Sequence, residues 1–310
     1  MGRTSTVRRI STAVLVRVAA ALLALAAGAA AIAIAAARLH STPGPVSSGS
    51  AAAASPAPSS KPSSSSFPAP PAGAIVFARE DGPNALALAV TPSSVQVSVV
   101  GQQGSGVSGL AVTVNGISAA ACGPGCYRAP VRDARSIAVR VGSTRWRVPV
   151  AKARDASALV ARAARVWRSL HTLVFTDRLG SDATHVVFSE WKAVAPNRLS
   201  YAIRRGASAV IVAGRRWDRA PGGKWIESPQ SVQVHEPVPL WQSATDAHVV
   251  GETATAWLVT FYDPGTPAWF AVTVDKKTSR TLDLHMVTTA HFMHERYGPF
   301  DAPLTIRPPG

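Results

Sequence analysis

The sequence predicts a mainly β protein that is held at a membrane by one N-terminal helix. An uncharged segment of twenty residues, 18–37, lies near the N-terminus, and a segment rich in Ser, Pro and Ala follows it. Beyond these, short runs of alternating apolar residues are separated by turn residues almost to the end of the 310-residue chain. We therefore expect a transmembrane helix, a linker, a small immunoglobulin-like sandwich and a curved antiparallel half-barrel with a leading helix.

Residues 1–40 are expected to form a cytoplasmic tip and a membrane anchor. As a helix, residues 18–37 would span about 30 Å, which is the thickness of a bilayer core. Four arginines precede this segment, so the positive-inside rule predicts a cytoplasmic N-terminus and an extracytoplasmic bulk in a single-pass protein of the cell membrane. The alternative is a cleaved signal sequence, after which the rest of the chain would be secreted.

Residues 41–72 are almost entirely Ser, Pro and Ala, a composition that predicts a disordered linker. The chain has a formal net charge of +15, but its basic residues are spread along the sequence and form no dense stripe. This distribution argues against nucleic acid as a partner. The high content of Ala and Arg is typical of a GC-rich bacterial source, such as an actinobacterium.

Residues 73–150 alternate short apolar runs with turns and predict the immunoglobulin-like sandwich. Cys122 and Cys126 are the only cysteines. In an exported protein an even pair predicts a disulfide, and the Gly-Pro-Gly between them permits so tight a ring. The alternative is a copper or redox site, because two thiolates at this spacing can bind a soft metal. The expected strands are Leu86–Val90, Val95–Val100, Leu110–Val114, Ser136–Val141 and Arg145–Val150.

Residues 151–310 predict the half-barrel. Asp155–Leu170 is expected to be a helix with Asp155 as its N-cap and an apolar stripe of Leu159, Ala163, Val166 and Leu170. Short strands joined by explicit turns then predict an antiparallel meander. The proline-rich segment 229–246 is expected to cross the sheet as a loop or lid. The strands are expected in Val186–Val194, Leu199–Arg204, Ala209–Ala213, Arg216–Arg219, Lys224–Ile226, His248–Val250, Thr255–Tyr262, Ala268–Val274 and Thr281–Thr289.

Large aromatic side chains recur in these strands and predict an apolar cavity. A sheet of nine or more strands has a wider apolar face than one helix can cover, and the uncovered part would suit an apolar ligand. The candidate lining residues are Trp191, Tyr201, Trp217, Trp225, Trp241, Trp257, Trp269 and Phe270. The alternative is that these side chains only fill a core.

Residues 155–310 resemble the LolA-like lipoprotein-carrier superfamily, including the LppX/LprG-type lipoproteins of actinobacteria. The resemblance lies in the leading helix and in Ala195–Tyr201, Val210–Trp217, Gly222–Trp225, Met286 and His291–Met293. It implies a half-open barrel around a cavity that holds a lipid or an acyl chain. The chain departs from the family because it lacks the lipoprotein cysteine. With Gly106–Leu110 and Cys122–Ala129, residues 74–150 also resemble the β-sandwich modules of bacterial copper-resistance membrane proteins.

We found no catalytic constellation: no G-x-S-x-G, dinucleotide or phosphate-binding motif is present. His285, His291 and His294 form the densest histidine cluster, but no Asp, Glu or Cys completes a familiar metal spacing. We therefore expect no enzyme activity, cofactor or bound metal. The expected function is binding of a lipid or another apolar ligand by a membrane-anchored extracytoplasmic protein. The alternatives are an envelope-stress or signalling ectodomain that binds a partner protein, and an accessory protein that handles copper through the two cysteines and the histidines.

Overall fold

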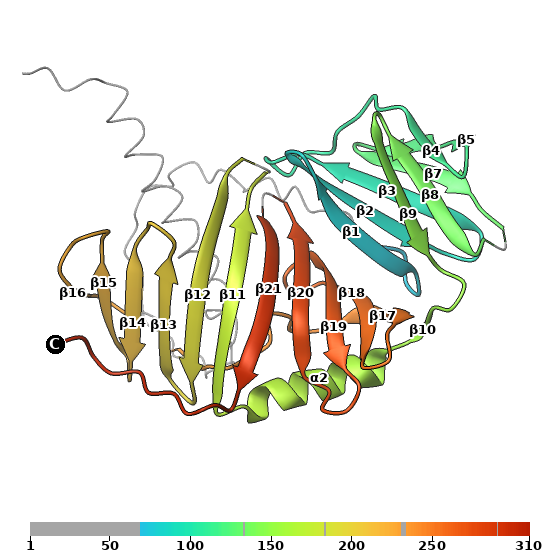
Figure 1. Cartoon of the computed structure of the whole chain (residues 1–310). Helices are drawn as coiled ribbons and strands as arrows, with labels where there is room; N and C mark the ends of the chain where they lie inside the picture. Colours follow the sequence, from blue (N-terminus) through green and yellow to red (C-terminus); the bar gives the residue numbers. More distant parts are fainter. Residues whose placement is uncertain (1–68, 133, 183, 231–233, 290) are drawn as a thin grey trace, which may run out of the picture. The chain divides into compact units, whose positions relative to one another are not determined.

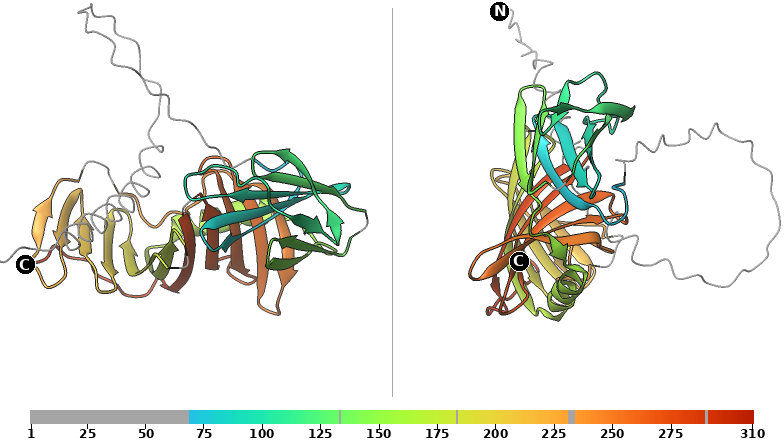
Figure 2. Two further views of the ribbon diagram at one scale, coloured as in Figure 1. Left: turned by 90° about the horizontal axis from the view of Figure 1, so that it is seen from above. Right: turned by 90° about the vertical axis from the view of Figure 1, so that its right-hand side faces the viewer.

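The computed structural model describes residues 69–132, 134–182, 184–230, 234–289 and 291–310 (Figure 1). The predicted anchor at 18–37 and nearly all of the predicted linker lie outside these ranges. No helix among the described residues is long and apolar enough to cross a membrane. The described chain is mainly β, with one helix and open, curved sheets (Figure 2).

The first nine strands form two sheets, with strand orders β1-β2-β3-β7-β6 and β5-β4-β8-β9. Val97 and Tyr127 of the first sheet share a buried core with Val114 and Ile137 of the second, so the two sheets pack face to face. The classification as immunoglobulin-like stays a prediction. The strands are β1 (Ile75–Asp81), β2 (Asn84–Val90), β3 (Ser94–Val100), β4 (Val112–Val114), β5 (Ile117–Ser118), β6 (Ala120–Gly123), β7 (Cys126–Pro130), β8 (Ser136–Val141) and β9 (Thr144–Pro149).

The rest of the chain builds one antiparallel sheet of 12 strands, in the order β10-β17-β18-β19-β20-β21-β11-β12-β13-β14-β15-β16. The strands are β10 (Arg154–Asp155), β11 (Thr172–Gly180), β12 (Val186–Val194), β13 (Arg198–Ile203), β14 (Ser208–Val212), β15 (Arg215–Arg219), β16 (Ile226–Ser228), β17 (Thr245–Glu252), β18 (Ala256–Asp263), β19 (Ala268–Asp275), β20 (Thr281–Thr288) and β21 (His291–Phe300).

The sequence predicted a simple meander, and the observed strand order shows that this prediction is wrong. The strands β11 to β16 run as a meander away from β11, and β17 to β21 run back towards it. The last strand, β21, then pairs with β11 along Leu173↔Phe300 to Gly180↔Phe292. Turn signals predicted four of the hairpins, those of β13–β14, β15–β16, β18–β19 and β19–β20, whereas β21 was not among the expected strands. No local signal marks the pairing of two strands that lie more than 100 residues apart.

The helix α2 (Ser157–Ser169) begins two residues later than expected. Its N-cap is Ala156, which makes no side-chain cap, so the assignment of Asp155 as N-cap is wrong. The Asp155 carboxylate instead accepts a hydrogen bond from Ser157 Oγ (2.7 Å). The buried stripe includes Trp167, which the predicted stripe omits, whereas Val166 is only partly buried. The stripe is therefore rotated towards Trp167.

Alternation along the strands gives the 12-stranded sheet two different faces. One face, here called the concave face, packs against α2 through Leu159, Val160 and Trp167. The opposite face of β18–β21 carries a second cluster, in which Trp269 and Tyr262 contact Val76 and its neighbours in β1 and β2. Phe270 lies on the concave face and Trp269 on the opposite face because successive residues of a strand point to opposite sides.

We expect Trp269→Ala to destabilise the chain by about 3–5 kcal/mol, because it removes a large ring from a buried cluster and leaves a cavity. Trp257→Ala, on the concave face of the neighbouring strand, should cost clearly less because Trp257 is only partly buried. Chemical unfolding of the two variants measures this difference. Equal losses of stability would contradict the burial of Trp269 against β1 and β2.

Candidate functional site

A continuous row of aromatic rings crosses the concave face. Its members, in spatial order, are Phe270, Phe261, Trp241, Trp167, Tyr297, Phe175, Trp191 and Tyr201. Successive ring centroids lie 4.5 to 6.4 Å apart, which is the range in which aromatic pairs attract one another. The register explains the second half of the row, because Tyr297, Phe175, Trp191 and Tyr201 are direct neighbours across four strands.

The two halves of this aromatic row differ in burial. Phe270, Phe261, Trp241 and Trp167 are at most 4% exposed, because α2 and the segment around Trp241 cover β17–β21. Phe175, Trp191 and Tyr201 are each only partly buried. The described residues therefore leave the β11–β13 part of the row partly open.

The segment around Trp241 is fixed to the sheet by a buried carboxylate. Asp263, at 0% exposure, accepts hydrogen bonds from the backbone N–H groups of Gln242 (2.8 Å) and Ser243 (3.2 Å). Further along the segment, the backbone N–H of Glu236 donates to the carbonyl of Pro196 (3.0 Å). The described part of the predicted lid, 229–246, thus lies against the concave face.

Three carboxyl groups lie beside the row on the same face. Asp177 and Glu295 are direct partners across β11 and β21, and both are more than 90% buried. Glu236, from the covering segment, is near enough to Glu295 to raise its pKa. The Tyr297 hydroxyl donates to Glu295, and Ser189 Oγ donates to Asp177 (3.4 Å).

Burial is the main cause of unusual protonation in this carboxyl cluster. It raises the pKa of Glu295 to about 8, with a further contribution from the neighbouring Asp177. It likewise raises the pKa of Asp177 to about 7, although the Ser189 hydrogen bond opposes the change. The pKa of Glu236 rises to about 7 for the same reason. Glu295 is therefore mainly protonated at neutral pH, and all three carboxyl groups are mainly protonated at lower pH.

The β13–β16 end of the concave face carries a polar group of side chains. The Arg216 guanidinium donates to the Tyr201 hydroxyl (3.1 Å) and to the Asp218 carboxylate (2.8 Å). Ser228 Oγ also donates to Asp218. These residues are partly exposed, so the aromatic row ends at a charged and solvent-accessible cluster.

The eight predicted lining residues are divided between the faces. Trp191, Tyr201, Trp241, Trp257 and Phe270 lie on the concave face, as expected for a common site. Trp217, Trp225 and Trp269 do not: the first two pack with Val212 and Ile306, and the third faces β1 and β2. The prediction missed Trp167, Phe175, Phe261 and Tyr297. The register of β21 on β11 would have identified two of these, but it is not visible in the sequence.

Of two surface hollows in the described chain, only one includes a predicted lining residue, Trp241. One, of about 350 Å³, is lined by turn residues of 206–208 and 219–223 and touches none of the aromatic row. The other, of about 310 Å³, lies between α2 and the segment around Trp241.

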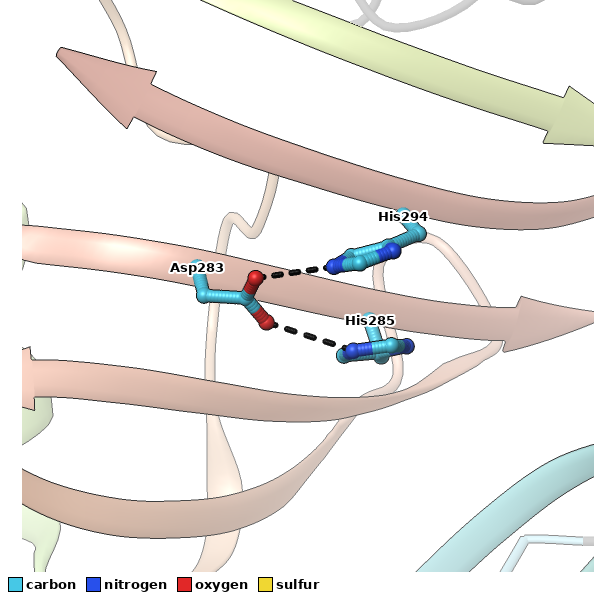
Figure 3. A group of neighbouring side chains, drawn as sticks. All are labelled: Asp283, His285 and His294. Atoms are coloured by element: carbon cyan, nitrogen blue, oxygen red, sulfur yellow. Dashed lines mark hydrogen bonds and ion pairs between the residues drawn. The ribbon is translucent and has the colours of Figure 1, made fainter.

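The structure shows where the two cysteines and the three clustered histidines lie. Cys122 and Cys126 form a disulfide, as predicted, so the thiolates that the copper hypothesis requires are absent. His285 and His294 are direct neighbours across β20 and β21, whereas His291 lies on the opposite face of β21. The Nδ1 atom of His291 lies 3.3 Å from the carbonyl oxygen of Thr289. Asp283, which the sequence prediction did not include, joins His285 and His294 (Figure 3).

No known protein family and no curated protein matches the sequence. Solved structures are similar to half of the chain. The match to LprF from Mycobacterium bovis covers 50% of this chain and 96% of LprF, with 8% identity and a TM-score of 0.36. The match to a LolA superfamily protein from Nitrosomonas europaea covers 49% of this chain and 95% of that protein, with 9% identity and a TM-score of 0.25.

The buried carboxyl groups predict a pH-dependent stability. Because the pKa of Glu295 is raised from 4.5 to about 8, the folded chain keeps a proton that the unfolded chain releases between these pH values. The free energy of unfolding should therefore fall with rising pH in this window, by up to about 1.4 kcal/mol per pH unit for each such group. Glu295→Gln should flatten this dependence, as chemical unfolding from about pH 5 to about pH 8 will show.

The matched control for this experiment is Glu227→Gln. Glu227 is exposed, and hydrogen bonds from Arg215 lower its pKa, so it is already ionised throughout the same window. This variant should keep the pH dependence of the parent chain. A parent chain whose stability is constant or rises between pH 5 and pH 8 would contradict the protonation of the carboxyl cluster.

Proposed function

We propose that this chain is a non-enzymatic, extracytoplasmic binding protein that holds a lipid or another apolar ligand on the concave face of its 12-stranded sheet. The observation that carries the proposal is the partly open aromatic row at Phe175, Trp191 and Tyr201. An apolar ligand would remove these rings from water, which is the main source of affinity in such sites.

The dimensions of the sheet support an uncovered binding surface. At about 4.8 Å between neighbouring strands, 12 strands extend over roughly 53 Å. The helix α2 has 13 residues and is therefore about 20 Å long. Together with the segment around Trp241 it packs on β17–β21, and the partly exposed rings lie beyond it.

The polar group at Arg216 supports an amphiphilic ligand. Tyr201 is the last ring of the row and also accepts a hydrogen bond from Arg216. An acyl chain along the rings would place its polar end beside this cluster. Burial contributes about 0.8 kcal/mol per methylene group, so roughly ten methylenes give useful affinity before the cost of ordering the ligand.

The proposal includes a location outside the cytoplasmic membrane. Residues 18–37 would anchor the chain in the cytoplasmic membrane, with residues 41–72 as a spacer and residues 73–310 outside. The division of the outer part into domains at 73–150 and 151–310 follows the change from the two smaller sheets to the 12-stranded sheet. Cleavage after the apolar segment would release the same binding unit.

Trp191→Ala should weaken the binding of an apolar ligand by about tenfold or more, because a large ring contributes roughly 1.5–3 kcal/mol when it is fully buried. Native mass spectrometry of the full chain, purified from a bacterial envelope and followed by organic extraction, measures the bound lipid. Trp225→Ala is the matched control, since Trp225 is also partly buried but packs in a different cluster. It should keep the lipid content of the parent chain.

Two results would contradict this function. One is a parent chain that carries no lipid and takes up none from added vesicles. The other is equal lipid content in the Trp191→Ala and Trp225→Ala variants. Either result favours an ectodomain that binds a partner protein, in which the aromatic row only fills a core.

A further inference from the structure

A second cluster of chemically active side chains lies on the face of the sheet opposite to the aromatic row. Asp283 and His285 are two residues apart on β20 and therefore point to the same side. His294 of β21 is the direct cross-strand partner of His285. Trp167, Tyr297 and the buried carboxyl groups belong to the other face, so this cluster is separate from the proposed ligand site.

The three side chains converge on one point, as Figure 3 shows. Asp283 Oδ1 lies 3.2 Å from His285 Nε2, and Asp283 Oδ2 lies 2.8 Å from His294 Nε2. The two imidazole rings are stacked, with centroids 3.9 Å apart and an angle of 16° between their planes.

We infer that Asp283, His285 and His294 form a binding site for a divalent transition-metal ion of the zinc type. Their potential ligand atoms all lie within 4.8 Å of one another. Two ligands of a tetrahedral zinc ion, each about 2.1 Å from the metal, are separated by roughly 3.4 Å. The two His–Asp distances are already near this value, so small rotations of the side chains would admit the ion.

The residue types indicate which metal the site prefers. Two neutral imidazoles and one carboxylate suit Zn²⁺, Cu²⁺ and Ni²⁺ better than Mg²⁺ or Ca²⁺, which prefer oxygen ligands alone. Three protein ligands leave a fourth position for water. His285 is exposed, so an ion can reach the site from solvent.

The neighbouring charges are compatible with a cation. Arg296 Nε lies 3.7 Å from Asp283, but the Arg296 side chain is 74% exposed and can move into solvent when an ion binds. Arg178 is the cross-strand neighbour of His294, and both of its terminal nitrogens donate to Glu80 (3.1 Å each). The carboxylate of Glu80 thus compensates the second positive charge.

Titration of the metal-free full chain with ZnCl₂ tests this inference. We expect one saturable site by calorimetry and a higher unfolding temperature at saturation, because an ion that binds only the folded chain stabilises it. His285→Gln and His294→Gln should each lower the affinity by at least the roughly 10–100-fold that changes around metal ligands cost.

His291→Gln and His185→Gln are the controls. His291 is close to His294 in the sequence but lies on the opposite face of β21. His185 pairs with Asp182 elsewhere on the surface. Both variants should bind zinc as the parent chain does. Circular dichroism without metal shows whether each variant folds, and the absorption spectrum of bound Co²⁺ reports its coordination independently of stability. The inference is overturned if the parent chain binds no zinc saturably, or if the His285 and His294 variants bind it unchanged.

Discussion

The pairing of β21 with β11 is the constraint on which the rest of the C-terminal structure depends. It joins β17–β21 to β11–β16 in one sheet. On the concave face it places Tyr297 beside Phe175 and Glu295 beside Asp177, and on the other face it places His294 beside Arg178. A shift of one residue would exchange the two faces of β21 and separate all of these groups. The aromatic row, the buried carboxyl cluster and the position of His294 therefore share one structural origin.

This dependence explains what the sequence could predict. Local signals suffice for hairpins, so the strands from β12 to β15 and from β18 to β20 were expected close to their observed places, and the Cys122–Cys126 disulfide is confirmed. The partition of aromatic residues between faces requires the long-range register. Trp269 and Phe270 are adjacent in the sequence and were assigned to one cavity, yet they lie on opposite faces. Asp283 was overlooked because it becomes a neighbour of His294 only through the β20–β21 pairing.

The concave face combines apolar burial with an electrostatic cost. Asp177 and Glu295 lie among aromatic rings, where an ionised carboxylate would lose most of its hydration. The raised pKa values of both carboxyls limit this cost because they favour the protonated forms, and Tyr297 and Ser189 supply hydrogen bonds to them. Such groups stabilise a fold less than apolar residues of the same size would. Their presence beneath the covering segment is more easily understood if this face binds a ligand than if it is only a core.

The alternation of a β-strand also keeps the two proposed sites independent. Glu295 and Tyr297 of β21 belong to the concave face, whereas His294 and Arg296 belong to the other. A substitution at His294 removes a metal ligand without touching the aromatic row, and one at Trp191 leaves the histidines unchanged. The two sites nevertheless share the backbone of β21, so an ion that holds β20 to β21 would also stabilise the strand that carries Tyr297 and Glu295. Zinc binding should therefore stabilise the sheet whether or not the concave face is occupied.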